Sequence, residues 1–228
     1  MRLIDLFQEL DKKSLSAKER IKQEYYRVKE FLDGRVPTRM ELFTYMDDKI
    51  YQYCIKHSKE NPFRRYLEFL KEIRELSAEE ESMYGGIGRE FLSLLETTDM
   101  QKVYKMPVLY SFYHEGDVRL AVTDEEVLEA WKKFFDNGTN WKDFAEDISY
   151  ADYKAMTDKQ HLSKAKSMPI KFLKASGKGF FVEKEGFALA MREDLKEVIG
   201  NGAFCRHMKD ILEYRTVEYY RRRYTGES

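Results

Sequence analysis

The sequence predicts a mainly α-helical fold of the α+β class, in which a helical bundle precedes a helical region with small β-hairpin elements. Four Ser/Thr-x-x-Glu capping boxes each precede apolar residues at helical spacing, at Ser16/Glu19, Thr38/Glu41, Ser77/Glu80 and Thr123/Glu126. Strand-like alternation of apolar and polar residues occurs only after residue 117. We therefore expect two domains, a helical bundle over 1–100 and an α+β domain over 101–228.

The helices of the first hundred residues follow from apolar spacing and from helix-breaking residues. The spacing predicts helices over 16–33, 38–57, 62–76 and 77–95. Gly34 and Pro37 end the first of them, because glycine tolerates a left-handed backbone and proline cannot continue a helix. Gly85, Gly86 and Gly88 interrupt the last one. Short breaks between helices of this length are typical of a bundle.

The second domain combines a basic helix with short strands. Residues 118–121 are a predicted strand, and 180–183 with 187–190 form a predicted β-hairpin in which Gly186 supplies the positive φ of the turn. A basic helical segment over 159–178 precedes the hairpin. A helix followed by a glycine-flanked hairpin is the outline of a winged-helix unit, which makes a winged-helix-like arrangement the hypothesis for this region.

The composition is that of a folded globular protein of the cytoplasm. The 228 residues are 43% apolar and 14% aromatic, enough to fill a core and too aromatic for a disordered chain. A charged content of 36% and a mean hydropathy of −0.67 exclude a membrane protein. The first thirty residues lack the apolar core of a signal peptide, and two cysteines are too few for a disulfide scaffold. We expect a cytoplasmic protein with no membrane partner.

The net charge of −1 conceals an uneven distribution of charge along the chain. Residues 115–152 hold eleven acids and four bases, whereas 153–224 hold nine acids and sixteen bases. Within the basic part, 159–182 contain six lysines and no acid. Such a segment favours a contact with phosphate groups, although basic side chains also serve simply as a solvated face or pair with the acidic segment of the same fold.

The residue patterns that carry catalysis or bind metals have ordinary structural explanations in this chain. Cys54 and His57 have the spacing of half a zinc site, but both fit a helix whose apolar face takes a cysteine. Asp47 and Asp48 precede a lysine as in some nucleases, yet they fall mid-helix in the prediction, where a solvated charged face is expected. No phosphate loop is present. We therefore predict no catalytic residue, no metal and no cofactor, and leave enzymatic activity open.

The basic segment and a C-terminal arginine run are the candidate nucleic-acid contacts. Lysines bind phosphates as point charges, and arginines between tyrosines add planar hydrogen-bonding and stacking groups. The predicted phosphate contacts are Lys164, Lys166, Lys171, Lys174, Lys178, Arg221, Arg222 and Arg223.

Three stretches of the sequence, 34–48, 97–113 and 213–224, carry a resemblance to a known family. They read GRVPTRMELFTYMDD, TTDMQKVYKMPVLYSFY and EYRTVEYYRRRY. They resemble the region that follows the motor in large bacterial DEAD/DEAH-type superfamily 2 helicases of the restriction or phage-defence kind. The similarity spans about 31–224 and does not include the motor motifs. It implies a non-catalytic C-terminal accessory module that contacts nucleic acid beside a helicase motor in cis or in trans. DNA is favoured over RNA as the partner, and the sequence does not decide between the two.

Two other functions stay open at this point. A protein-interaction module that docks on the motor or on another defence partner would use the aromatic residues around Tyr104–Tyr113 and leave the lysines dispersed. A small metal-dependent nuclease would need Asp47, Asp48 and a third acid to converge on one ion.

Overall fold

The computed structural model describes residues 15–225, which divide into two compact units between Ser77 and Ala78. It confirms the predicted class, because helices dominate and the described strands form only two small antiparallel sheets. Residues 1–14, on which part of the signal-peptide prediction rests, and 226–228 lie outside the described range. Across the described residues, no helix is both long enough and apolar enough to span a bilayer.

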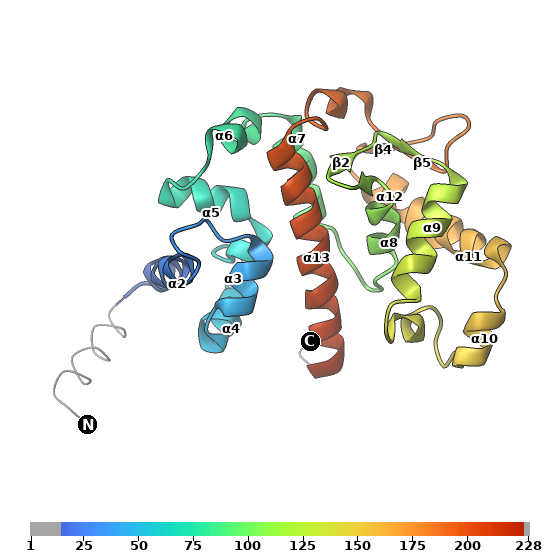
Figure 1. Ribbon diagram of the computed structural model, residues 1–228, viewed down its shortest axis with the longest axis horizontal. Helices are drawn as coiled ribbons and strands as arrows, with labels where there is room; N and C mark the ends of the chain where they lie inside the picture. Colours follow the sequence, from blue (N-terminus) through green and yellow to red (C-terminus); the bar gives the residue numbers. More distant parts are fainter. Residues whose placement is uncertain (1–14, 226–228) are drawn as a thin grey trace. The chain divides into compact units, whose positions relative to one another are not determined.

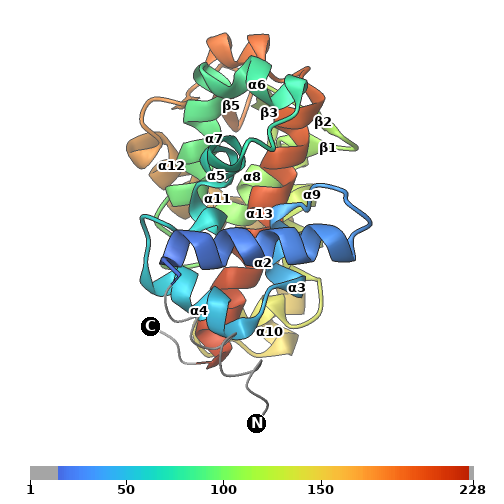
Figure 2. The same cartoon turned by 90° about the vertical axis from the view of Figure 1, so that its left-hand side faces the viewer.

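The first unit is helical throughout its described part. Its elements are α2 (Ala17–Phe31), α3 (Arg39–Tyr45), α4 (Asp48–Lys56), the 3-10 turn η1 (Pro62–Arg64) and α5 (Tyr66–Ile73). Helix α2 lies against α3 and α4, as Figure 2 shows. The predicted capping boxes close at the starts of α2 and α3, and Gly34 follows α2 with a φ of +81°. The buried side chains Tyr25, Phe63 and Leu70 belong to the core of this unit.

The continuous helix expected over 38–57 is wrong. The chain breaks after Tyr45, and Asp47 begins a new helix by accepting hydrogen bonds from the backbone N–H groups of Lys49 and Ile50. A short carboxylate side chain competes for backbone N–H groups in this way, which makes it a strong helix-start residue. The charged run at Asp47 is thus a helix cap instead of a mid-helix face.

The second unit contains a long C-terminal helix and two small sheets. Its helices are α6 (Ala78–Tyr84), α7 (Ile87–Thr97), α8 (Lys105–Tyr110), α9 (Asp124–Phe135), α10 (Tyr150–Ala155), α11 (Asp158–Ala165), α12 (Lys171–Ser176) and α13 (Gly202–Thr225). Shorter turns are η2 (Asn140–Asp143), the π-helical η3 (Lys166–Ile170) and η4 (Glu193–Glu197). Its strands are β1 (Tyr113–His114), β2 (Asp117–Val118), β3 (Ala121–Val122), β4 (Phe181–Val182) and β5 (Leu189–Met191).

Residues 78–100, which the sequence analysis grouped with the first domain, lie in the second unit. They do so because α6 and α7 pack against α13 (Figure 1). Nε2 of His207 lies 2.7 Å from Oε1 of Glu80, which joins α13 to α6. The buried Arg215 donates hydrogen bonds to the carbonyls of Glu96 and Thr98, at 2.9 and 2.6 Å. These carbonyls close α7, so the arginine stabilises the end of that helix.

The predicted hairpin is confirmed. Strands β4 and β5 pair antiparallel with Phe181 opposite Met191, and Gly186 has a φ of +81° in the connection. A third strand, β3, pairs with the other edge of β5. The single strand expected over 118–121 is instead divided between β2, which pairs with β1, and β3. Between β2 and β3 the chain passes from one sheet to the other. The alternation of apolar and polar residues does not reveal this change.

An aromatic core holds the helices of this unit in place. Trp131, Phe135 and Phe144 are buried and in ring contact with one another, and Tyr104 joins them from the turn before α8. A second cluster centres on Phe91 and ties α7 to the hairpin and to α13. The basic segment contacts the first of these clusters, because the ring of His161 in α11 lies 5.0 Å from that of Phe144.

Candidate nucleic-acid interface

One continuous helical run, composed of α11, η3 and α12, carries most of the predicted lysine contacts. Thr157 begins it with a capping box closed by Gln160. Pro169 lies inside the run, where a proline removes a backbone donor, and the turn there is π-helical. Pro169, Ile170 and Leu173 are buried. The exposed residues of the run include Lys159, Lys166 and Lys171.

The run ends at a glycine that close packing requires. A Cβ atom on Gly177 would lie 2.3 Å from the carbonyl oxygen of Leu173 and 2.6 Å from the ring of Phe181. Any other residue would require the last turn of α12 and the ring of Phe181 to shift. Gly177 therefore fixes where the next residue, Lys178, leaves the helix, and Lys178 has the left-handed φ of +49°.

Three exposed lysines, Lys159 and Lys171 in this run and Lys178 just after it, form no ion pair with any residue between 15 and 225. The neighbouring acid Asp158 is engaged by Lys132, with Oδ1 at 2.8 Å from Nζ. These three ammonium groups are the strongest candidates for contact with an external anion. Lys159 belongs to the acid-free segment but was not among the predicted contacts.

Two other predicted contacts, Lys166 and Lys174, are neutralised by acids that lie outside the acid-free segment. Nζ of Lys166 is 2.6 Å from Oδ2 of Asp124, and Nζ of Lys174 is 2.5 Å from Oε1 of Glu183. Both pairs are at least partly exposed, and such pairs contribute little stability. Their effect here is electrostatic, because they remove two positive charges from the face.

Lys164 is directed toward the aromatic core instead of toward solvent. Its Nζ lies 5.3 Å from the ring centre of Tyr104 and 5.1 Å from that of Phe144. The side chain is half-buried, and burial lowers its pKa. A cation between aromatic faces is held by them, so Lys164 connects α11 to the core.

The arginine run at the end of α13 also contains both paired and unpaired side chains. Arg223 forms an ion pair with Asp143 and donates a hydrogen bond to the hydroxyl of Tyr219 at 3.2 Å. Asp143 is only 2% exposed, and burial raises its pKa. Arg221 is half-buried, whereas Arg222 is exposed and forms no ion pair with a described residue. This run therefore holds α13 against η2 and leaves one arginine outward.

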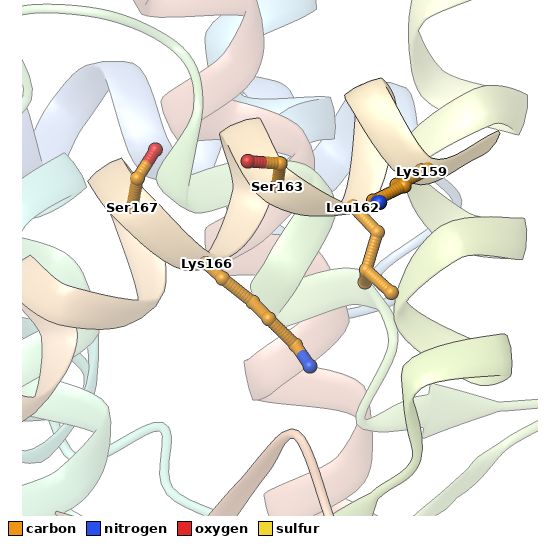
Figure 3. Close-up of a pocket in the computed structure, with 5 residues that line it drawn as sticks. All are labelled: Lys159, Leu162, Ser163, Lys166 and Ser167. Atoms are coloured by element: carbon orange, nitrogen blue, oxygen red, sulfur yellow. The ribbon is translucent and has the colours of Figure 1, made fainter. Parts of the chain in front are cut away.

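A hollow of about 480 Å³ lies on the face of α11 and η3, where Figure 3 shows its lining. Lys166 and Leu162, one turn apart, extend to the same side. The lining combines two ammonium groups and two hydroxyl groups with one apolar side chain: Lys159, Leu162, Ser163, Lys166 and Ser167. Ammonium and hydroxyl groups are donors to phosphate oxygens. The spacing 159, 163, 166, 167 is helical, and that periodicity is the signal that would have identified the serines from sequence.

The other patterns singled out in the sequence have structural partners. Cys54 is buried, and burial raises the pKa of its thiol to about 12. His57 stacks on Tyr53 at 3.9 Å between ring centres. Over residues 15–225, no three His, Cys, Asp or Glu side chains lie close enough together to hold a metal ion. Tyr104 and most of the apolar residues of α8 are buried, so the aromatic stretch of the docking alternative lies largely in the core.

Comparison of the chain with protein-family models, with curated proteins and with solved structures finds no match in any of the three.

Proposed function

We propose that the outward face of α11, η3 and α12 binds the phosphate backbone of a nucleic acid. One observation carries the proposal: three exposed lysines without ion-pair partners among the described residues lie within residues 159–182, a segment that contains no acid. Ser163 and Ser167 line the adjoining hollow and add donors. The order of a helix followed by a hairpin, which is the outline of a winged-helix unit, also supports nucleic-acid binding.

The mechanism is release of counterions from the nucleic acid. Each phosphate neutralised by a lysine contributes about 0.7 to 0.9 to the slope of log affinity against log salt concentration. Three unpaired lysines predict weak binding, with a dissociation constant of about a micromolar or weaker at physiological salt, and little dependence on base sequence. No residue of the chain is assigned a catalytic step in this proposal.

The test is a triple variant measured against a matched control. Lys159→Ala/Lys171→Ala/Lys178→Ala should lower the salt slope by about two to three units. The control triple Lys49→Ala/Lys56→Ala/Lys59→Ala removes exposed lysines of the first unit, which likewise form no ion pair with a described residue, and should bind like the parent. Labelled oligonucleotides titrated at several salt concentrations give both slopes. No binding by the parent at low salt would favour the protein-docking alternative.

We also propose that this binding serves a superfamily 2 helicase motor, acting in cis or in trans, as an accessory module. The three sequence stretches that resemble the region after such motors support this. The gene context tests it: a helicase motor encoded directly upstream of this segment, or beside it, is the expected arrangement. A neighbourhood with no nucleic-acid enzyme would contradict it.

A further inference from the structure

Helix α12 exposes an aromatic ring within the segment that carries the proposed phosphate contacts. Phe172 is 50% exposed, and Met168, one turn earlier in η3, is 40% exposed. Phe172 immediately follows Lys171, and the next turn contributes only the small exposed side chains of Ala175 and Ser176. An exposed aromatic ring next to a lysine in the chain can contact the aromatic part of a ligand whose charged part the lysine binds.

The ring of Phe172 differs from the other exposed phenylalanine rings in having no partner. Phe31 packs on Tyr45 at 4.8 Å between ring centres, and the ammonium of Lys184 covers the ring of Phe187 at 5.3 Å. Within residues 15–225, no ring stacks on Phe172 and no cation covers it. Its surface is therefore available to an incoming planar group.

We propose that the ligand of this face is single-stranded nucleic acid, with a base stacked on Phe172 and the flanking phosphates held by Lys171 and Lys178. This inference rests on the proposed function and specifies its substrate class. In a duplex the faces of the bases are hidden by their neighbours, so an exposed ring meets only sugars and phosphates and gains little. In a single strand every base offers a π-face, and cationic grooves with interleaved aromatic rings bind it with little sequence preference.

The residues around Phe172 leave space for a single strand of nucleic acid. Ala175 and Ser176 leave room beside the ring because their side chains are small. Met168 offers a flexible apolar surface to a second base. Lys174 of α12 forms an ion pair with Glu183, the residue that follows β4.

The test compares single and duplex probes on the full chain. The probes are a fluorescein-labelled oligothymidylate of about 20 nucleotides and a blunt hairpin duplex of similar charge. Phe172→Ala should weaken binding of the oligothymidylate by about 5- to 140-fold and leave the salt slope unchanged, because stacking carries no charge. Phe31→Ala removes an exposed phenylalanine of the first unit and should bind like the parent. Lys171→Ala should lower the slope by about 0.7 instead.

A second variant keeps the test decisive if Phe172→Ala folds poorly. Phe172→Trp retains the stacking surface, so it should bind the oligothymidylate as tightly as the parent, and its added indole emission should be quenched as bases stack on it. Equal affinity of the parent for both probes, together with no effect of Phe172→Ala, would overturn the single-strand inference while leaving the proposed function intact. Failure of the parent to bind either probe at low salt would overturn the proposed function itself.

Discussion

Two basic regions of the chain differ in how their side chains are paired. One is formed by the lysines in and just after α11 and α12, and the other by the arginines at the end of α13. Lys171 and Lys178 face outward without ion-pair partners among the described residues. Arg223 is paired with the buried Asp143 and bonded to Tyr219. The first region leaves exposed cations without an ion-pair partner among the described residues, whereas the second pairs a cation with an acid that the fold has buried.

A run of basic residues in the sequence therefore does not by itself form a basic surface. Asp124 neutralises Lys166 from 42 positions away, and Asp143 reaches Arg223 from another helical turn of the same unit. A buried acid must be paired or protonated, because an ionised carboxylate away from water is strongly unfavourable. The nearest cation is then committed to structure, whatever its sequence context.

Arg223 and Arg222 should differ strongly in their contribution to the free energy of unfolding. Arg223→Ala leaves Asp143 buried without its ion pair and should lower the free energy of unfolding by about 2 to 3 kcal/mol. Arg222→Ala removes an exposed neighbour and should change it by less than about 0.5 kcal/mol. Urea denaturation of both variants at neutral pH measures the difference. Equal destabilisation by the two changes would contradict the structural role of Arg223.

The same variant has a pH dependence with a definite sign. Burial raises the pKa of Asp143, and Arg223 opposes that rise, so Arg223→Ala should raise the pKa further. An acid whose folded pKa is raised favours folding at low pH and loses that contribution as pH rises through the folded pKa. The stability deficit of Arg223→Ala should therefore shrink on acidification. A deficit that grows as pH falls would rule out Asp143 as its source.

A smaller effect is expected when a paired lysine, Lys174, is compared with an unpaired one, Lys171. Lys174 is neutralised by Glu183, so Glu183→Gln should free its ammonium and raise the salt slope of nucleic-acid binding by about 0.7 to 0.9. Lys174→Ala in the parent should change the slope much less than Lys171→Ala. Salt titrations of the three variants with one oligonucleotide measure this. An equal loss from Lys174→Ala and Lys171→Ala would show that the ion pair does not matter.

Much of the fold was predictable because its signals are local. Capping boxes at Ser16, Thr38 and Thr123 satisfy N–H groups within three residues, and the structure closes all three. The hairpin around Gly186 follows from turn chemistry. The break at Asp47 was missed because a helical apolar pattern continues across it. The grouping of α6 and α7 with α13 depends on contacts such as Glu80 with His207, whose partners are 127 positions apart.

The candidate site was predictable only as a region. The acid-free segment identified where the cations are, and the helical spacing of Lys159 with Lys166 placed them along one run. It did not show that Lys164 turns toward aromatic rings or that Lys166 and Lys174 find acids elsewhere. Those outcomes depend on tertiary neighbours, which no local pattern encodes.

Protection of individual lysines from acetylation by bound nucleic acid would locate the interface at residue level. The full chain is acetylated briefly at low salt, with and without saturating oligothymidylate, and the rate at each lysine is read by mass spectrometry. Lys159, Lys171 and Lys178 should be protected, whereas Lys49, Lys56 and Lys59 should react at unchanged rates. Protection spread evenly over all exposed lysines, or confined to the first unit, would contradict the assignment of the α11–α12 face as the nucleic-acid interface.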